Sequence, residues 1–219
     1  MMNRASFSLI PALILGCVLT AFGQVASTPP ALPVKVLAQS PADTQTELQI
    51  ICLFQSSSGA LQGSLLETDQ KLHGLLTQLW KPGLFHGELG ETVLLWPPAG
   101  TLAAKQFLII GLGDAATFTP QRMYLAGKIA FREANRLGAA HPYFAPTIRD
   151  GGIDKFATGE IAEQVVRGLE DAMSTESLLR SGSAAEPLVV VDFTFLAGAK
   201  FATDTQHGID RVLGKSPSP

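Results

Sequence analysis

A glycine-rich turn is the first feature of the sequence that could bind a ligand. Gly111, Gly113 and Asp114 follow an apolar run that is typical of a buried strand. The string matches G-x-G-x-x-A, a fingerprint that holds a pyrophosphate at a helix N-terminus. However, the next helix is expected only at Thr119, and Glu133, about 20 positions on, falls inside that helix. We therefore interpret the turn as a strand exit and keep Gly111, Gly113 and Asp114 as the candidate edge of a ligand crevice.

Other side chains with catalytic potential do not form a recognisable motif. No two histidines have helical ligand spacing, and neither H-E-x-x-H nor paired cysteines occur. Cys52 lies in an apolar run and is expected to be a small buried hydrophobe rather than a nucleophile. Glu160 and Glu163 fall on the polar side of an expected helix, where solvation is the usual state. The sequence thus predicts no catalytic residue, no metal ligand and no cofactor.

A basic stripe is the remaining candidate. Lys128, Arg132 and Arg136 are spaced so that they stack on one helix face, with Glu133 beside them. Such a stripe could bind an anionic ligand or partner, but an ordinary solvated helix face is the preferred interpretation. The net charge is −3 and no block of lysine or arginine occurs, so nucleic acid is not expected as a partner.

The first 23 residues predict export. A short basic leader precedes the nearly uninterrupted apolar run at 9–22, and small residues up to Gly23 favour cleavage before Gln24. A loose lipobox that would lipidate Cys17 is an alternative, and so is an uncleaved anchor barely long enough to span a bilayer. We expect a periplasmic or secreted protein, or else a lipoprotein. Contact with a membrane is expected only through the export signal or a lipid on Cys17.

One domain is expected at 32–213, between a flexible linker at 24–31 and a disordered tail at 214–219. Strand patterns alternate with helical ones, which predicts a mostly parallel sheet. The hydrophobic fraction of 46% is enough for a core without disulfide or metal. Strands are expected at 32–37, 48–54, 91–96, 105–110, 143–148 and 187–196, and helices at 65–80, 119–138, from 158 onward and at 200–213.

Local signals refine these elements. Thr119 and Thr158 are predicted N-caps, and Gly138 is expected to close the helix that Thr119 opens. Pro146 favours an edge position or a bulge for its strand. The expected fold class is therefore α/β, a three-layer α/β/α arrangement with a mostly parallel or mixed sheet and helices on both faces.

The stretch from Lys105 to Gly138, KQFLIIGLGDAATFTPQRMYLAGKIAFREANRLG, resembles the N-terminal domain of the leucyl aminopeptidase family. In that family a strand ends in a G-L-G-type turn, and an F-T-P-like cap opens an alanine-rich helix. Thr158 to Met173, TGEIAEQVVRGLEDAM, is similar to the next helix of that domain, and the resemblance extends over roughly 34–213. It implies a macro-domain-like fold without chemistry, because the family's N-terminal domain contributes to assembly and shields the active site of a separate catalytic domain.

The resemblance gives no catalytic residue to this chain. The family's catalytic domain holds two metal ions around the signature N-T-D-A-E-G-R-L, and the nearest string here, Thr203-Asp204-Thr205, lacks every later element. We therefore expect an exported, stand-alone, non-catalytic domain for binding or assembly. Its expected partner is a separate peptidase subunit or a second copy. The alternatives are a macro-domain-like binder of a nucleotide or another small anion and, less favoured, a metal-dependent aminopeptidase.

Overall fold

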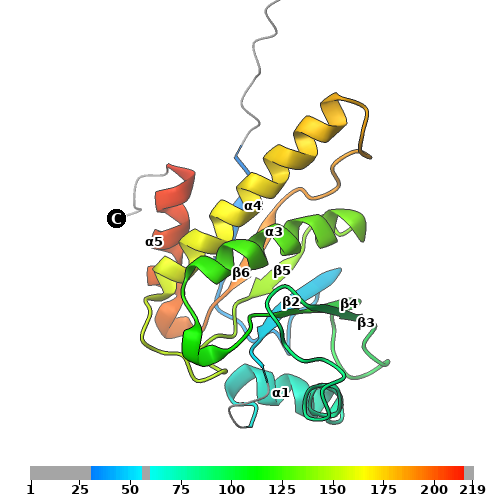
Figure 1. The fold of residues 1–219 in the computed structure, drawn as a ribbon, viewed down its shortest axis with the longest axis vertical. Coiled ribbons are helices and arrows are strands. Elements are labelled where there is room, and N and C mark those ends of the chain that lie inside the picture. Colours follow the sequence, from blue (N-terminus) through cyan, green and yellow to red (C-terminus); the bar gives the residue numbers. More distant parts are fainter. Residues whose placement is uncertain (1–30, 56–59, 215–219) are drawn as a thin grey trace, which may run out of the picture.

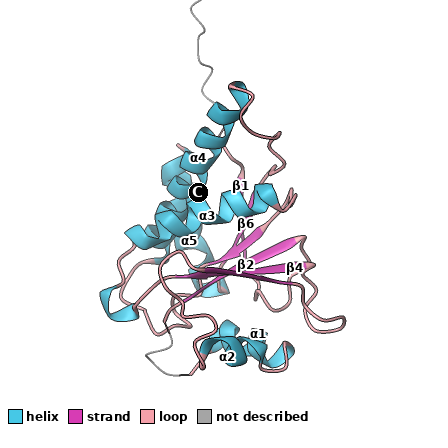
Figure 2. Ribbon diagram, turned by 45° about the vertical axis from the view of Figure 1, so that its right-hand side comes forward, coloured by secondary structure: helices cyan, strands magenta, loops and turns pink. Residues whose placement is uncertain are grey.

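The computed structural model describes residues 31–55 and 60–214, so the expected export signal, Cys17, most of the linker and nearly all of the tail lie outside the described residues. A six-stranded sheet lies between two layers of helices (Figures 1 and 2). Five strands run parallel, and the last one in spatial order is antiparallel to its neighbour. The predicted three-layer α/β/α class is confirmed. The spatial order is β1 (Val34–Leu37), β6 (Phe193–Leu196), β5 (Tyr143–Ala145), β2 (Leu48–Leu53), β4 (Gln106–Gly111) and β3 (Thr92–Leu95).

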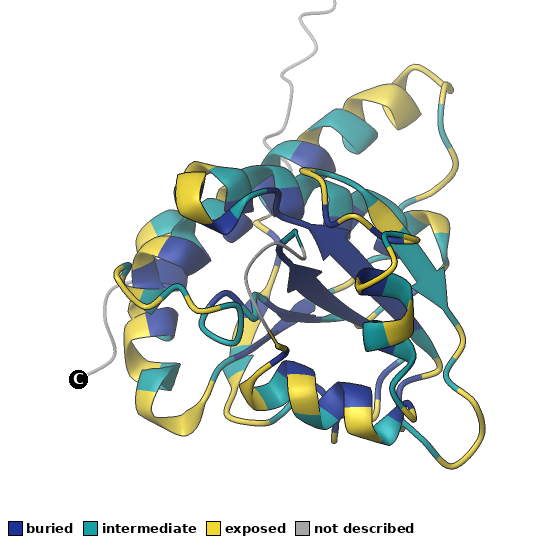
Figure 3. Ribbon diagram, turned by 60° about the horizontal axis from the view of Figure 1, so that its bottom comes forward, coloured by how far each residue is buried: buried dark blue, intermediate teal, exposed yellow. Residues whose placement is uncertain are grey.

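Both faces of the sheet are covered, which explains why β2 is apolar at successive positions. Ile50 and Cys52 belong to the core beneath one helical layer, and Ile51 and Leu53 belong to the core beneath the other. All four side chains are buried, as expected for a central parallel strand. The strands in the middle of the sheet are coloured as buried in Figure 3. The first layer holds α3 (Gln121–Arg136), α4 (Thr158–Ser181) and α5 (Ala202–Leu213), and the second holds α1 (Gly63–Lys71) and α2 (Leu75–Trp80).

Glycines let α3 and α4 approach closely. A Cβ on Gly127 would lie 2.2 Å from the carbonyl oxygen of Val165, and one on Gly168 would lie 2.1 Å from that of Tyr124. The polar rims of the two helices then meet. Lys128 and Arg132 of the basic stripe pair with Asp171 and Glu176 of α4, at 2.6 and 3.4 Å. Arg136 pairs within α3, with Glu133. The stripe is therefore used largely to join two helices.

The single helix predicted at 65–80 is wrong, because the chain turns between α1 and α2. His73 and Gly74 have positive φ angles of 55° and 82°. Asp69 then accepts from the backbone N–H and the hydroxyl of Thr77, at 3.0 and 2.6 Å, and so caps α2. Leucines before and after this turn pack into the same core. Their helical periodicity therefore continues through the turn, and only Gly74 signals it in the sequence.

Both predicted threonine caps are also wrong. The N-cap position of α3 is Pro120 and that of α4 is Ala157, neither with a side-chain cap, and Thr158 is the first residue of its helix. The other end of α3 is as predicted: Gly138 has a φ of 73° just beyond the helix, where its neighbour Ala139 donates back to Ala134 at 2.9 Å.

Two strand predictions need correction. β5 does not lie at an edge as Pro146 suggested, but between β6 and β2, and it ends at Ala145 so that the proline is outside the ladder. The strand predicted at 187–196 is shorter, because only 193–196 pairs with neighbouring strands. Apolar residues before it, including Val190, pack against the core without joining the ladder.

Candidate functional site

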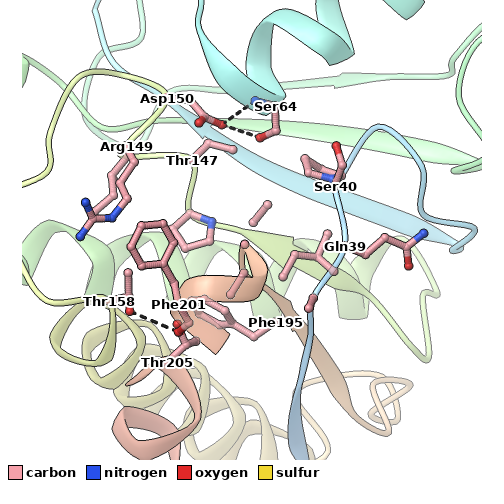
Figure 4. Close-up of a pocket in the computed structure, with 18 of the residues that line it drawn as sticks. Gln39, Ser40, Ser64, Thr147, Arg149, Asp150, Thr158, Phe195, Phe201 and Thr205 are labelled. Atoms are coloured by element: carbon pink, nitrogen blue, oxygen red, sulfur yellow. Dashed lines mark hydrogen bonds between the residues drawn. The ribbon is translucent and has the colours of Figure 1, made fainter. Parts of the chain in front are cut away.

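A cavity of about 380 Å³ opens at the carboxyl ends of β1, β5 and β6 (Figure 4). Its position follows from the topology. β2 and β5 are parallel neighbours, yet α1 follows β2 on one face and α4 follows β5 on the other. Connections that diverge in this way leave a crevice outside the strand ends, which is where ligands bind in open α/β sheets. The walls are residues 38–41, 146–150 and 197–199, with Ser64 and Glu67 of α1, Thr158 and Ile161 of α4, and Phe201 and Thr205 beside them.

The wall on the α1 side is built around Asp150. Its carboxylate accepts a hydrogen bond from the backbone N–H of Ser64 at 3.1 Å and another from the Ser64 hydroxyl. Partial burial raises the pKa of Asp150, and these hydrogen bonds oppose the rise. Gly63 is required here, since it has a φ of 52° and any Cβ would collide with the Asp150 carboxylate. The N-terminus of α1 is therefore occupied by a carboxylate of the protein itself.

The N-terminus of α4 is occupied in the same way. Asp204 accepts from the backbone N–H of Gly159 and from the hydroxyl of Thr158, both at 2.8 Å. These bonds, led by the one from Gly159, lower the pKa of Asp204, and the charge of Arg211 acts in the same direction. Asp204 lies in the first turn of α5, which crosses α4 closely because Gly208 and Gly159 face each other without side chains.

Arg149 is the one cation among the described residues that line the cavity. Its guanidinium carbon lies 4.3 Å from the centre of the Phe201 ring, a cation–π contact (Figure 4). Nη2 donates to the carbonyl oxygen of Phe156 at 3.1 Å, whereas Nε is buried and has no hydrogen-bond partner. No carboxylate of the described residues lies within ion-pair distance. Arg149 thus keeps unused donors and an uncompensated charge at the cavity.

The rest of the lining is mostly apolar, and it is held in place by a strained residue. Phe195, Ile148 and Ile161 contribute hydrocarbon surface. Between them, Thr147 has a φ of 49°, which is unusual for a β-branched residue. Its hydroxyl pairs with the backbone N–H and C=O of Cys52, so the ladder with β2 is continued by a side chain. Strain of this kind often marks a functional site.

The crevice residues predicted from the sequence lie elsewhere. Gly111, Gly113 and Asp114 stand at the carboxyl end of β4 and do not line this cavity. A Cβ on Gly111 would lie 2.0 Å from the carbonyl oxygen of Glu88, so the glycine accommodates a neighbouring loop. Asp114 caps a short 3-10 turn, η2 (Ala115–Thr117), which separates these glycines from α3. A ligand crevice at the three residues stays a prediction.

Sequence reasoning missed Arg149 and Phe201. The only signal for them was position: Arg149 directly follows the strand predicted at 143–148, and Phe201 lies at the start of the helix predicted after the last strand, and ligand sites of parallel sheets gather at such carboxyl ends. The role of Asp150 as a cap from a distant loop has no signal in the sequence. Cys52 is buried, as predicted, and burial strongly raises the pKa of its thiol. Among residues 31–55 and 60–214, no group of three His, Cys, Asp or Glu side chains could hold a metal ion.

Comparison with solved structures places this fold among two kinds of protein. A mutant of tomato leucine aminopeptidase has a TM-score of 0.59 and 21% identity, over 84% of this chain and 37% of the other. The Trypanosoma brucei macrodomain in complex with ADP-ribose has a TM-score of 0.57 and 15% identity, over 83% of this chain and 69% of the other. At these identities the likeness concerns the fold alone, and it supports the macro-domain-like class predicted from the sequence.

Sequence comparison identifies the family. The probable cytosol aminopeptidase of Burkholderia mallei (strain SAVP1) is 33% identical over 83 residues, which are 38% of this chain and only 16% of the relative. The family model for the N-terminal domain of the cytosol aminopeptidase family matches residues 50–182, more than half of the chain. The resemblance recognised at Lys105–Gly138 is thereby confirmed. The chain belongs to the cytosol aminopeptidase family, and the part of that family that it matches is the non-catalytic N-terminal domain.

Proposed function

We propose that this protein is a non-catalytic binding module whose ligand occupies the cavity at the carboxyl ends of β1, β5 and β6. One observation carries the proposal: the cavity lies where the chain connections diverge, and Arg149, the one cation among its described lining residues, has a buried Nε without an acceptor. A volume of about 380 Å³ is within the usual range for small-molecule sites. Apolar walls with a few polar groups are also typical of such sites.

A macro-domain-like nucleotide binder is the second candidate. It is supported by the structural likeness to a macrodomain whose complex contains ADP-ribose. A diphosphate would be favoured at a free helix N-terminus. At this cavity, however, the carboxylates of Asp150 and Asp204 already occupy the N-termini of α1 and α4. Two negative phosphates would meet two negative side chains, so we rank the nucleotide below a ligand with less charge.

A role in assembly is compatible with the binding role. The matched stretch covers a small part of the curated aminopeptidases, and the family's N-terminal domain is the part that matches. We propose that a separate peptidase subunit or a second copy of the chain is the partner. Size-exclusion chromatography with light scattering, with and without an aminopeptidase from the same cell, tests this: a larger complex is expected, and two independent monomers would contradict it.

Export also belongs to the proposal and depends on the apolar leader before Gln24. In the described part of the chain, no helix combines the length and apolar character that a bilayer crossing requires. N-terminal sequencing of the protein from its producing cell tests the idea. A chain beginning at Gln24 is expected, whereas a lipid-modified Cys17 at the N-terminus would favour a lipoprotein.

The binding role is tested by NMR with a fragment library and ¹⁵N-labelled protein. Chemical-shift changes are expected at residues 38–41, 146–150 and 197–199. In Ala199→Trp an indole would fill the mouth of the cavity, and the changes should disappear. Ala184→Trp places the same side chain at an exposed position away from the cavity and should leave them intact. A library without any hit at these residues, or hits that persist in Ala199→Trp, would refute the module.

A further inference from the structure

We infer that the cavity takes a small ligand with one carboxylate and an apolar body, bound through Arg149, rather than a nucleotide. The inference rests on the binding role proposed above and names its ligand class. It depends on three observations at the cavity: the occupied helix N-termini, the unpaired donors of Arg149 and the apolar walls.

The first observation limits the charge of the ligand. Three helix N-termini lie near the cavity, those of α1, α4 and α5, and backbone N–H groups at such positions attract anions; that of α5, after the 3-10 turn η3 (Ala199–Phe201), has no side-chain cap. Asp150 fills the first, through the N–H of Ser64, and Asp204 fills the second, through the N–H of Gly159. Glu67 is the second carboxylate of the walls, beside Asp150, and it accepts from the hydroxyl of Ser40 at 2.6 Å. The two carboxylates in the walls, Asp150 and Glu67, disfavour a polyanionic ligand, so a single negative charge on the ligand is best placed at a cationic side chain.

That side chain is Arg149. In the described part of the chain its guanidinium makes one hydrogen bond, from Nη2 to Phe156, and Nε is left without an acceptor. Stacking on Phe201 fixes the plane of the guanidinium. A planar guanidinium with free N–H groups on one edge matches the two oxygens of a carboxylate, which it binds through two parallel hydrogen bonds.

The apolar walls determine the rest of the ligand. Phe195, Leu196 and Ile161 line the cavity beyond the charged group, and side chains of this kind gain by covering hydrocarbon. The volume lies near the lower end of the range for small-molecule sites, which favours a compact ligand over one that carries a nucleoside and two phosphates. A branched or aromatic monocarboxylate fits this combination.

The test measures the affinity of the purified protein for three probes by NMR titration: 4-methylpentanoate, its neutral amide 4-methylpentanamide, and ADP-ribose. The carboxylate is expected to bind at the cavity about tenfold more tightly than the amide, as a charge-assisted pair requires. ADP-ribose is expected to give no shifts there. This comparison uses the unmodified protein, so it does not depend on any variant that could fail to fold.

Two variants test whether Arg149 is the residue that recognises the carboxylate of the ligand. Arg149→Gln should weaken the carboxylate about tenfold and leave the amide unchanged. Lys200→Gln is the matched control, because Lys200 also lies over the Phe201 ring, at 4.8 Å, but does not line the cavity. Lys200→Gln should change the affinities for the carboxylate and the amide by no more than about twofold from those of the unmodified protein, since an exposed charge is screened by water and salt.

The outcomes separate the inference from the binding role. Equal affinity for carboxylate and amide, retained affinity in Arg149→Gln, or tight binding of ADP-ribose would overturn the monocarboxylate and leave a binding module with another ligand. The absence of cavity shifts with all three probes, together with an empty fragment screen, would overturn the module itself. Cavity shifts for the carboxylate that vanish in Arg149→Gln and persist in Lys200→Gln would support both.

Discussion

The carboxylate of Asp150 caps α1 by accepting a hydrogen bond, at 3.1 Å, from the backbone N–H of Ser64, which lies 86 positions earlier in the chain. Asp204 makes the equivalent contact with Gly159 at 2.8 Å, and so caps α4 from α5. Two helix N-termini at one edge of the sheet are thus satisfied by loops and helices that are distant in sequence. The two aspartates differ in one respect: the pKa of Asp150 is raised and that of Asp204 is lowered.

Removal of the first cap should destabilise the protein. Asp150→Ala leaves the N–H of Ser64 without its acceptor, and the loss of a cap costs about 1 kcal/mol of unfolding free energy. Asp150→Asn keeps an acceptor and removes the partly buried charge. It should therefore equal or exceed the unmodified protein in stability at pH 7, as urea unfolding will reveal. Equal losses of unfolding free energy in Asp150→Ala and Asp150→Asn would contradict burial as the main cause of the raised pKa of Asp150.

The pH dependence of the same variant follows from the raised pKa. Protonation of Asp150 is more favourable in the folded state than in the unfolded state, so the protonated carboxyl adds to the unfolding free energy. This contribution is fully present below about pH 3.8. It is lost as the pH rises through the higher folded-state pKa. The advantage of Asp150→Asn should therefore grow as the pH rises from acid to neutral. Unfolding curves at several pH values give this difference, and an advantage that shrinks with rising pH would refute it.

Asp204 should behave in the opposite way. Its folded-state pKa is lowered, so its stabilisation is present above the ordinary value near 3.8 and is lost as the pH falls through the folded-state pKa. Asp204→Ala should lower the unfolding free energy by about 1 kcal/mol at pH 7 and by progressively less in acid. Urea unfolding at neutral and acid pH measures both quantities. A deficit that stays constant with pH would show that the cap does not depend on the charge.

The crossing of α3 and α4 gives a test of the packing. Gly127→Ala raises helix propensity, but its Cβ would meet the Val165 carbonyl oxygen at 2.2 Å. The helices must separate, which should lower the unfolding free energy by about 1–3 kcal/mol. Gly182→Ala, just after α4, meets nothing closer than 3.5 Å and should change stability little. A stabilised Gly127→Ala protein would mean that the crossing is wider than described.

The register of α3 is tested by adjacent substitutions. Phe131 is fully buried and stacks on Phe193, with ring centres 6.4 Å apart. Phe131→Ala should therefore lower the unfolding free energy by about 3–5 kcal/mol. Arg132 is partly exposed and pairs with Glu176, so Arg132→Ala should remove less than about 1 kcal/mol. Thermal and urea unfolding of both variants decide the point, and similar losses would mean that the helix is turned differently.

The purified protein should not hydrolyse leucyl-amide substrates when manganese, zinc or cobalt is present. A two-metal peptidase needs carboxylates that converge on ions held close together. The family match of this chain is to the N-terminal domain, and its described residues hold no group of metal ligands. Leucine p-nitroanilide assays measure this directly. Turnover by the protein alone, lost with a chelator and restored by metal, would contradict a non-catalytic role.

The sequence by itself determined the layers of the fold. Runs such as Ile50 to Leu53 are apolar on both faces of the strand, which is a property of a strand covered by helices on two sides. The stripe that includes Met123 and Phe131 determined which side of α3 is buried. Such patterns are readable because burial repeats with the local period of a strand or a helix. They gave the class and the location of the main elements, whereas the family followed from the resemblance of the stretch Lys105 to Gly138.

Only the tertiary structure decided the candidate site. Arg149 lies in the loop after β5 and Phe201 ends the 3-10 turn at Ala199–Phe201 after β6, and they meet because β5 and β6 are neighbours in the sheet. Asp150 reaches Ser64 for a similar reason, since the strands before them, β5 and β2, pair directly. A local pattern carries no information about which loops come together. That is fixed by strand order and by the divergence of helices to opposite faces, so the cavity and its one unpaired cation became visible only in three dimensions.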